Sequence, residues 1–413
     1  MKAKNLILIA SLGLFAACSS NDEPGAQTPE TIEVDKVLQL TAAESAAQAE
    51  LQDFNIEFFQ AVNASQGKGN VLTSPMSAQL LLSFLANASH DELTDEIVSA
   101  FGCSSLADVN SLSKKYMTML PGIDPASRFS LCNGAWYSDM YTLSPSFQST
   151  ASDVFSADIF KTDFTDNVKA LKEINGWVSD KTNKLIPEVL RSLQPTTLFV
   201  LANAMYFKGS WKYKFEKRNT KEGVFHGTDG DSRVEMMFAP SLDNPMLYSY
   251  SKEYGYQVVK RGFGNGAFEA VFVLPIDENT DIDEFISSDA LKSLKDLSFQ
   301  SKHMFLTFPK FKMAPEEELE LNKPLAALGI KSMCFDDLKL FNEPAEGILQ
   351  TLQKATVEFN EDGAEASAVT IGLGLTASLP PDNFEMIFDH PFVFMINLKS
   401  TGTSLIAGKV ANL

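Results

Sequence analysis

The chain has 413 residues, 45% of them hydrophobic and 21% charged, and its 34 basic against 53 acidic side chains give a formal net charge of −19. This apolar fraction is typical of a globular core and excludes a disordered or collagen-like chain. The acidic excess argues against a nucleic-acid partner, against heparin-like polyanions and against docking of a basic patch on an anionic membrane, because each needs clustered Lys and Arg. Four cysteines in this length do not make a disulfide framework.

The start of the chain is typical of an export signal. Two lysines precede an apolar stretch at residues 6–15, which is too short to span a bilayer core of about 30 Å. The small residues before Cys18 resemble a bacterial lipoprotein signal, in which this cysteine is lipidated and becomes the mature N-terminus. A plain secretory signal is the alternative. We therefore expect residues 1–17 to be removed, residues 18–44 to form a polar tether, and the product to be an outer-membrane lipoprotein at the cell surface.

Beyond the tether, residues 45–413 are predicted to form one domain, because neither a linker nor a repeat interrupts them. Its first part is helical: apolar residues from Leu51 to Phe59 recur at helical spacing, and Ser74-Pro75 precedes a run apolar enough to be a buried helix. Later runs read as strands, and many lack in–out alternation, which predicts burial on both faces. The strand-like runs are RFSLCNGAWYS, TTLFVLANAMYF, FEAVFVLP, HMFLTFPKFKM, FVFMINL and SLIAGKV. Helical patterns such as ALKEINGWVSDKTN and LNKPLAALGI fall between them, and this mixed order favours an α+β fold over a doubly wound sheet.

A search for catalytic chemistry finds very little. The four histidines, none in a metal-binding spacing, are His90, His226, His303 and His390. The chain contains no CxxC pair, no GxSxG elbow and no Walker loop, and the glycines of RGFGNGAF are better explained by a hairpin turn. His90 is expected in a solvated turn, while His303 and His390 are expected to be structural. The cysteines beyond the signal, at 103, 132 and 334, are expected to be buried free thiols.

The informative segment is residues 357–381, which alternate at the period of a strand. One parity carries only small residues, namely Ala364, Ala366, Ala368, Thr370, Gly372, Gly374 and Thr376. Gly and Ala are poor strand formers, yet the segment keeps one face free of bulk along its length. It is therefore suited to remain an exposed loop and then to slide between two strands. A flexible Ala/Gly-rich linker is the alternative reading.

Ordered motifs over nearly the whole domain resemble one family. They are NVLTSPMSAQLLLSFLANAS from Asn70, INGWVSDKTNKLIPEVL from Ile174, TLFVLANAMYFKGSW from Thr197, and then FPKFKM, LAALGIKSMCF, FDHPFVFMI and GKV. With the alternating segment, these strings are similar to those of the serpins, over roughly residues 45–413. The resemblance implies an α+β serpin fold with about three β-sheets and eight to nine helices. It also implies an exposed reactive-centre loop at about residues 359–381.

The function that this resemblance implies is suicide inhibition of extracellular proteases, and not enzymatic catalysis. The target protease cuts the loop and forms an acyl-enzyme, after which the upstream half of the loop inserts into the central sheet and traps the protease. Such a protein needs no cofactor, and we expect a monomer whose partner is the target protease and whose only membrane contact is the lipid anchor. A non-inhibitory serpin-fold binding or carrier protein at the cell surface is the alternative.

Within the loop, the resemblance assigns a hinge and a scissile bond. The hinge residues are Glu361, Asp362, Gly363, Ala364, Glu365, Ala366, Ser367 and Ala368. Counting the usual loop length from the hinge places the scissile bond at Ala377–Ser378, and a small Ala377 suits an elastase-like serine protease. Cleavage after Thr376 or Leu375 is the alternative; Leu375 would suit chymotrypsin-like proteases or cathepsin-like cysteine proteases.

The resemblance also implies a set of residues that control opening of the sheet. Trp211 matches the tryptophan beneath the site where the loop first enters, and a polar cluster is expected under the parting strands at Ser74, Ser77 and Asn203. Many family members have His where this chain has Gln353, which can still donate and accept hydrogen bonds but does not titrate.

Overall fold

A computed structural model describes residues 38–194, 196–240, 244–314, 319–331, 338–342, 346–364 and 384–413. The expected signal and Cys18 lie outside the described residues, and so does segment 365–383. Within the described residues, no helix is both long enough and apolar enough to cross a bilayer. The first helix, α1, begins at Ala42 after the capping residue Thr41.

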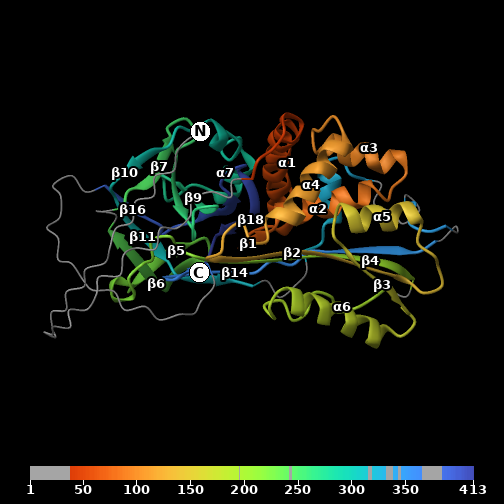
Figure 1. Ribbon diagram of the computed structural model, residues 1–413. Coiled ribbons are helices and arrows are strands. Elements are labelled where there is room, and N and C mark those ends of the chain that lie inside the picture. The colour runs from red at the N-terminus through yellow and green to blue at the C-terminus, as the bar shows by residue number, and fades with distance from the viewer. Residues whose placement is uncertain are drawn as a thin grey trace, which may run out of the picture. The chain divides into compact units, whose positions relative to one another are not determined.

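Three β-sheets organise the chain (Figure 1). Sheet A has the strand order β12 (Phe311–Met313), β14 (Val357–Asn360), β15 (Gly363–Ala364), β4 (Thr197–Ser210), β2 (Ser127–Ser138) and β3 (Asp158–Thr162), and β13 (Ile348–Leu352) also pairs with β4. Sheet B has the order β1 (Val71–Thr73), β18 (Thr403–Val410), β17 (Phe392–Leu398), β9 (Phe268–Pro275), β8 (Tyr256–Gly262), β7 (Met246–Ser251) and β10 (Gln300–Lys302). Sheet C has the order β16 (Glu385–Ile387), β11 (Phe305–Pro309), β6 (Gly230–Pro240) and β5 (Lys221–Gly227).

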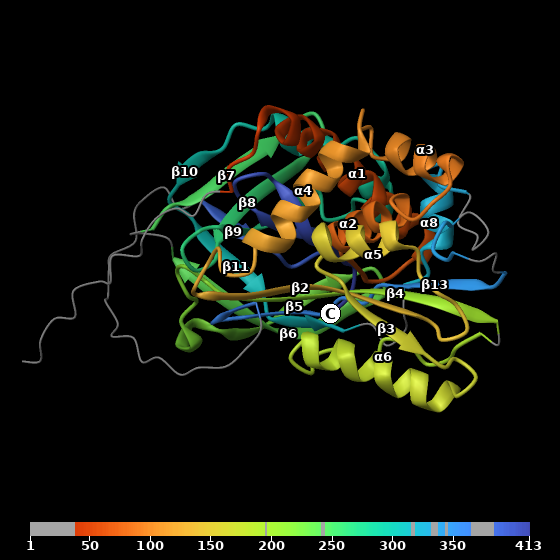
Figure 2. The same ribbon diagram turned by 45° about the vertical axis from the view of Figure 1, so that its right-hand side comes forward.

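Helices cover both faces of sheet A, as Figures 1 and 2 show. On one side lie α1 (Ala42–Gln66), α2 (Pro75–Ala86), α3 (Asp91–Ala100), α4 (Leu106–Met119) and α5 (Pro145–Asp153). On the other side lies α6 (Asn167–Lys181). The remaining helical segments are α7 (Ile282–Ser287), α8 (Asn322–Ala327) and the 3₁₀ turns η1 (Lys217–Asn219) and η2 (Lys292–Asp296). Helix α2 begins where the sequence predicts, because the Ser74 side chain accepts a hydrogen bond from the Ser77 amide and Pro75 occupies the first turn.

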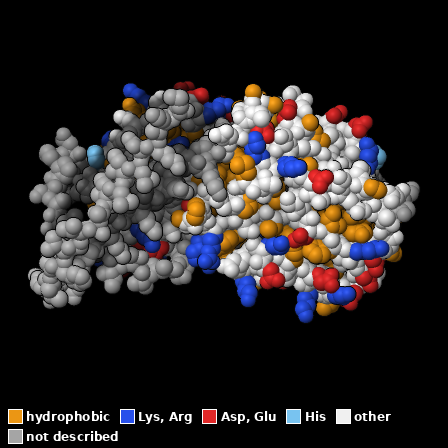
Figure 3. Space-filling model, viewed as in Figure 1, with side chains coloured by type: hydrophobic (Ala, Val, Ile, Leu, Met, Phe, Trp, Pro, Cys, Tyr) orange, Lys and Arg blue, Asp and Glu red, His pale blue; other side chains and the backbone are white. Residues whose placement is uncertain are grey.

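The two covered faces explain why strand β4 lacks an apolar–polar alternation. Its side chains alternate between two apolar clusters: Phe199 and Leu201 join the larger one, while Val200 and Ala202 join a smaller one that includes Ile174 of α6. Both parities must therefore be apolar. The outer side of α6 carries both charge signs, and red and blue side chains are interspersed along the corresponding lower edge of Figure 3.

The predicted hairpin turn is confirmed, whereas one predicted strand and the predicted burial of the cysteines need correction. The RGFGNGAF hairpin joins β8 to β9, with positive φ angles of 45° at Gly264 and 93° at Gly266. The run HMFLTFPKFKM is not one strand: it divides into β11 of sheet C, which ends at Pro309, and β12 of sheet A, which begins at Phe311 and pairs with β14. Cys103 and Cys132 are free but only half-buried, so full burial was wrong for both, and Cys334 lies outside the described residues.

Candidate functional site

Two of the predicted hinge residues form a short strand inside sheet A. Gly363 and Ala364 make up β15, which is antiparallel to β14 on one side, where Phe359 pairs with Ala364, and antiparallel to β4 on the other. At the opposite end of β4, β13 pairs with it directly and in parallel. Sheet A is thus divided at one end by the start of the hinge and closed at the other.

This placement corrects the expected extent of the exposed loop, which was to begin at about residue 359. Phe359 and Asn360 are buried strand residues, and Ala364 is 1% exposed. The physical reason is size. A methyl side chain at Ala364 fits between two strands, whereas the sequence pattern alone does not reveal where the strand ends and the loop begins.

A glycine is required at position 363. A Cβ atom there would lie 1.9 Å from the backbone oxygen of Gly209 and 2.8 Å from the Cα atom of Ser210. The preceding turn is held by Asn360, whose Oδ1 accepts hydrogen bonds from the Asp362 amide at 3.0 Å and from the Gly363 amide at 3.3 Å. A side-chain turn of this kind reverses the chain between two antiparallel strands, and it brings the hinge back toward β4.

Trp211 lies at the point where the hinge enters the sheet. Its Nε1 donates to the backbone oxygen of Asn360 at 2.9 Å, and its amide donates to the backbone oxygen of Asp362 at 2.9 Å. Its ring is stacked on Phe263, with ring centroids 4.4 Å apart. The tryptophan expected beneath the entry site therefore contacts the β14–β15 turn directly.

Lysines surround the two acidic residues of the turn. Glu361 is 5% exposed; its Oε1 accepts from Thr220 Oγ1 at 2.9 Å and its Oε2 lies 3.5 Å from Lys310 Nζ. Lys214 and Lys217 each place Nζ 3.1 Å from an Asp362 carboxylate oxygen. Partial burial raises the pKa of Asp362, but the hydrogen bonds from the two lysines outweigh it, so the pKa is lowered overall. The turn is consequently fixed by ion pairs from separate segments of the chain.

Arg261 is a buried residue of this region that the sequence analysis did not identify. Its guanidinium lies 4.1 Å from the ring centroid of Phe215 and 5.4 Å from that of Trp211, and it donates to the backbone oxygen of Tyr213. Burial lowers the pKa of Arg261 to about 9. Aromatic faces compensate part of the lost hydration of a buried cation, and Arg261 thereby links β8 to the segment that follows Trp211.

The polar cluster expected under the parting strands centres on Gln353. Gln353 Oε1 accepts from Thr73 Oγ1 at 2.6 Å and from the Ser74 amide at 3.2 Å, and its Nε2 donates to the Ser74 backbone oxygen at 2.9 Å. Ser74 Oγ donates to the backbone oxygen of Leu405 in β18 at 2.7 Å. The amide of Gln353 thus joins sheet A to the start of helix α2. Thr73 was missed, although it directly precedes the predicted Ser74-Pro75 helix start.

The structure does not bring all of the predicted cluster together. Asn203 Nδ2 donates to Asn133 Oδ1 at 2.8 Å, and Asn133 Nδ2 donates to the backbone oxygen of Phe155 at 2.9 Å. This pair joins β4 to β2, apart from the contacts of Gln353, whereas Ser77 belongs to the Ser74 cap. The sequence analysis missed Asn133. It lies opposite Asn203 in the register of β2 and β4, so only the strand pairing identifies it as a partner.

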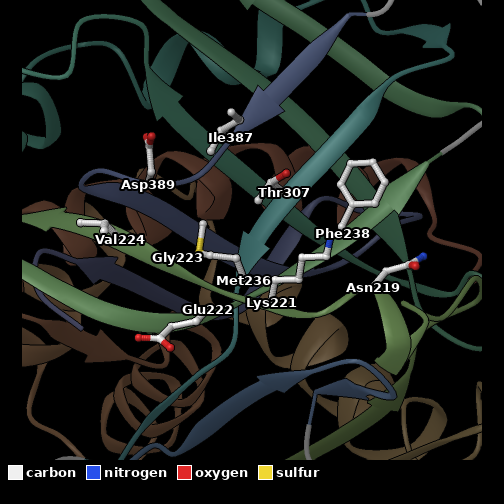
Figure 4. Close-up of a pocket in the computed structure, with 10 residues that line it drawn as sticks. All are labelled: Asn219, Lys221, Glu222, Gly223, Val224, Met236, Phe238, Thr307, Ile387 and Asp389. Carbon is white, nitrogen blue, oxygen red and sulfur yellow. The ribbon is translucent and has the colours of Figure 1, made fainter. Parts of the chain in front are cut away.

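A hollow of about 480 Å³ lies over sheet C (Figure 4). Strands β5, β6, β11 and β16 supply most of its lining, which consists of Asn219, Lys221, Glu222, Gly223, Val224, Met236, Phe238, Thr307, Ile387 and Asp389. These side chains include no histidine or cysteine, and their charged members are Lys221, Glu222 and Asp389. In the described residues, no group of three or more His, Cys, Asp or Glu side chains is arranged to hold a metal ion.

Comparison with known proteins decides the family. A family model described as Serpin (serine protease inhibitor) matches residues 49–413. This chain belongs to the serpin family. The leukocyte elastase inhibitor of Sus scrofa is 28% identical over 372 residues, covering 87% of this chain and 97% of the relative. Serpin-ZX of Arabidopsis thaliana is 30% identical over 365 residues, covering 83% of this chain and 92% of the relative.

Solved structures share this fold. The native state of the thermophilic serpin Tengpin matches with a TM-score of 0.79 and 26% identity, covering 91% of this chain and 95% of that chain. Human thyroxine-binding globulin matches with a TM-score of 0.79 and 21% identity, covering 90% and 99%, and shares the fold. The predicted α+β serpin fold is confirmed, since the described residues contain three sheets and eight α-helices.

The remaining predicted functional residues of this serpin lie outside the described residues. They are the hinge residues Glu365, Ala366, Ser367 and Ala368, the scissile-bond residues Ala377 and Ser378, the alternatives Thr376 and Leu375, and the lipidation residue Cys18. The described part of the site is therefore the entry point of the hinge and the polar groups beneath sheet A.

Proposed function

We propose that this serpin is a suicide inhibitor of extracellular serine proteases and not itself a catalyst. The observation that carries the proposal is β15: a two-residue strand between β14 and β4 is the start of the position that a longer inserted strand would occupy. In the sequence that follows Ala364, every second residue has a small side chain. About 15 inserted residues at roughly 3.3 Å each would move a bound protease about 50 Å.

The driving force is the pairing of the inserted strand on both sides. Each added hydrogen bond contributes about 0.5–1.5 kcal/mol net, so a full strand is favoured by about 10 kcal/mol or more. Cleavage between Ala377 and Ser378 would free the upstream half to insert. The small Ala377 and the elastase-inhibitor relatives both favour an elastase-like target, and this serpin is expected to act as a monomer without cofactor or polyanion.

A panel of elastase-, chymotrypsin-, trypsin- and papain-like proteases tests the proposal. Each is mixed with the protein at several ratios, and the products are separated in hot detergent. We expect a covalent complex with the elastase-type enzyme and a released C-terminal fragment whose mass corresponds to a start at Ser378. Cleavage of the protein as an ordinary substrate at every ratio, without a complex, would refute inhibition. A fragment that starts at Ala377 or Thr376 would move the scissile bond to one of the two alternatives.

We also propose that the protein is exported as an outer-membrane lipoprotein through Cys18. The basis is the basic, apolar and small-residue order of the first 18 residues. Expression in a bacterium with a lipoprotein pathway should give a mature N-terminus at residue 18 that carries acyl chains by mass spectrometry. Cys18→Ser should leave an unprocessed or unacylated product. Equal processing without acylation in both proteins would instead indicate the plain secretory signal.

A further inference from the structure

The junction between β16 and β17 attaches the downstream end of segment 365–383 to the domain. β16 pairs in parallel with β11, with Ile387 opposite Thr307, and the Phe388 amide donates to the Thr307 backbone oxygen at 3.0 Å. The His226 amide on β5 donates to the backbone oxygen of Asp389 at 2.6 Å. Ile387 and Asp389 also lie together at one edge of the hollow in Figure 4. The residues just after β16 are thus held by two strands of sheet C.

His390 ties this junction to sheet B in a way that requires two protons on its ring. The side chain is buried; its Nδ1 lies 2.8 Å from Asp389 Oδ1 and its Nε2 lies 2.9 Å from the backbone oxygen of Pro275 at the end of β9. A backbone oxygen only accepts hydrogen bonds, and so does an ionised carboxylate. Each ring nitrogen must therefore donate, and only the imidazolium has two N–H groups.

The charged groups around His390 support this state. Asp389 contacts it directly, Asp277 and Glu278 interact with it from the segment after β9, and His226 on β5 interacts with Asp389. Lys68 lines a pocket together with His226, Glu278 and Pro391. His226 has its own acidic partner, with Nδ1 2.8 Å from Asp231 Oδ1 on β6. Burial disfavours the charged imidazolium, but the hydrogen bonds to Asp389 and Pro275 outweigh it, so the pKa of His390 is raised. The bond from His390 in turn lowers the pKa of Asp389.

We infer that doubly protonated His390 is a positioning residue, which fastens the downstream end of the reactive loop by bridging Asp389 and β9. When the ring releases one proton to solvent, one nitrogen keeps its hydrogen and the other directs a lone pair at an oxygen acceptor. One of the two bonds then becomes a repulsion, and the junction opens more readily. The effect of this bridge on inhibition rests on the proposed function. A loop that is fixed at both ends presents its scissile bond to a protease at lower entropic cost.

Hydrogen exchange measured by mass spectrometry tests the inference without any protease. Peptides covering residues 384–391 are followed at pH 6.0 and 8.5 after correction for the intrinsic effect of pH on exchange. A raised pKa means that the bridge is complete at low pH and is lost as pH rises through that pKa. We expect about tenfold more opening at pH 8.5 in the wild type, the equivalent of about 1.4 kcal/mol. His390→Gln, which does not titrate, should show no such pH difference.

Two further variants make the result decisive. His90→Gln is the matched control, because His90 is exposed at the start of α3 and makes no capping hydrogen bond with its side chain; it should keep the wild-type profile. Asp389→Asn removes the carboxylate that favours the imidazolium, so the midpoint of opening should move to lower pH. If His390→Gln is not recovered folded, an identical midpoint in the wild type and Asp389→Asn overturns the inference.

The same pH series is then run on complex formation with an elastase-type protease, corrected for the activity of the protease at each pH. We expect slower complex formation of the wild type above neutral pH and a flat profile for His390→Gln. Opening that depends on pH without any covalent complex would refute inhibition and retain the role of His390. A complex that forms while residues 384–391 exchange equally at both pH values would refute the role of His390 alone.

Discussion

The indole nitrogen of Trp211 donates a hydrogen bond to the backbone oxygen of Asn360 at 2.9 Å, joining the residue after β4 to the last residue of β14. Between these two positions lies β15, the inserted start of the hinge. If β15 became longer, it would have to separate β4 from β13, which pairs with β4 farther along the strand. The bond therefore links the ends of the two strands that flank β15.

Trp211→Phe should keep most of the stacking on Phe263 and lose this hydrogen bond. We expect a loss of about 1 kcal/mol in the free energy of unfolding, because one buried carbonyl oxygen loses its donor. The covalent complex should form with a higher stoichiometry of inhibition. The comparison is Trp177→Phe, which removes an indole bond to Asp158 on the far face of sheet A and should leave inhibition unchanged. Equal stoichiometry for both variants would contradict a role for Trp211 in insertion.

Ala364→Arg places a long charged side chain where the native residue is 1% exposed between two strands. Burying an unpaired charge costs several kcal/mol, so the hinge should leave the sheet. We expect the variant to be cleaved by the target protease without forming a stable complex. Ala107→Arg, on the exposed surface of α4, is the control for added charge. Unchanged inhibition by Ala364→Arg would rule out insertion through this position.

Glu361→Gln should destabilise the turn that precedes β15. Glu361 is almost fully buried and bridges Thr220 and Lys310, so removing its charge leaves Lys310 with only its exposed partner Glu235. We expect a loss of about 1–2 kcal/mol, because a buried hydrogen-bonded carboxylate loses its charge while Lys310, 34% exposed, stays hydrated; it should appear as a lower thermal midpoint by circular dichroism. Glu235→Gln removes the exposed partner of the same lysine and should cost less than about 1 kcal/mol. If Glu235→Gln lost more stability than Glu361→Gln, the buried partner of Lys310 would not be the stabilising one.

Gln353→Leu keeps a side chain of similar size and removes three hydrogen bonds. It leaves the Thr73 hydroxyl and both backbone groups of Ser74 without these partners in a buried site, which should cost about 2–4 kcal/mol. Chemical denaturation checks this value. Gln39→Leu, at an exposed position, should stay within about 0.5 kcal/mol of the wild type. A near-neutral Gln353→Leu would mean that the amide is not needed to hold sheet A to α2.

The lowered pKa of the buried Glu44 carboxyl group leads to a prediction of how the free energy of unfolding changes in acid. Burial raises the pKa of Glu44, but hydrogen bonds from Lys115 and from the Thr41 amide outweigh it, with a further bond from Ser111, and lower the pKa to about 2. A lowered pKa means that this stabilisation is complete above pH 4.5 and is lost as pH falls toward 2. Glu44→Gln should lose about 2–3 kcal/mol at pH 7 and show a flatter profile in acid. Ser111→Ala should shift the loss to higher pH, and an unshifted wild-type profile in both variants would contradict this assignment.

Much of the fold follows from local patterns in the sequence. The buried helix after Ser74, the uninterrupted apolar strand β4 and the hairpin glycines each have one dominant local cause, and the structure agrees with all three. Strands β5 to β8 were not identified, because polar and charged residues interrupt their apolar runs. Their pairing in sheets B and C depends on neighbours distant in sequence.

The sequence by itself determined the family and the alternating small residues from Ala364 onward, because each is written in consecutive residues. Only the tertiary structure decided how far the hinge enters sheet A, because this depends on the approach of Gly363 to Gly209, some 150 residues earlier. The same holds for the lysines around the hinge turn, for the buried Arg261 and for the two acceptors of His390. These groups become partners only when separate segments converge, and local sequence carries no signal of that convergence.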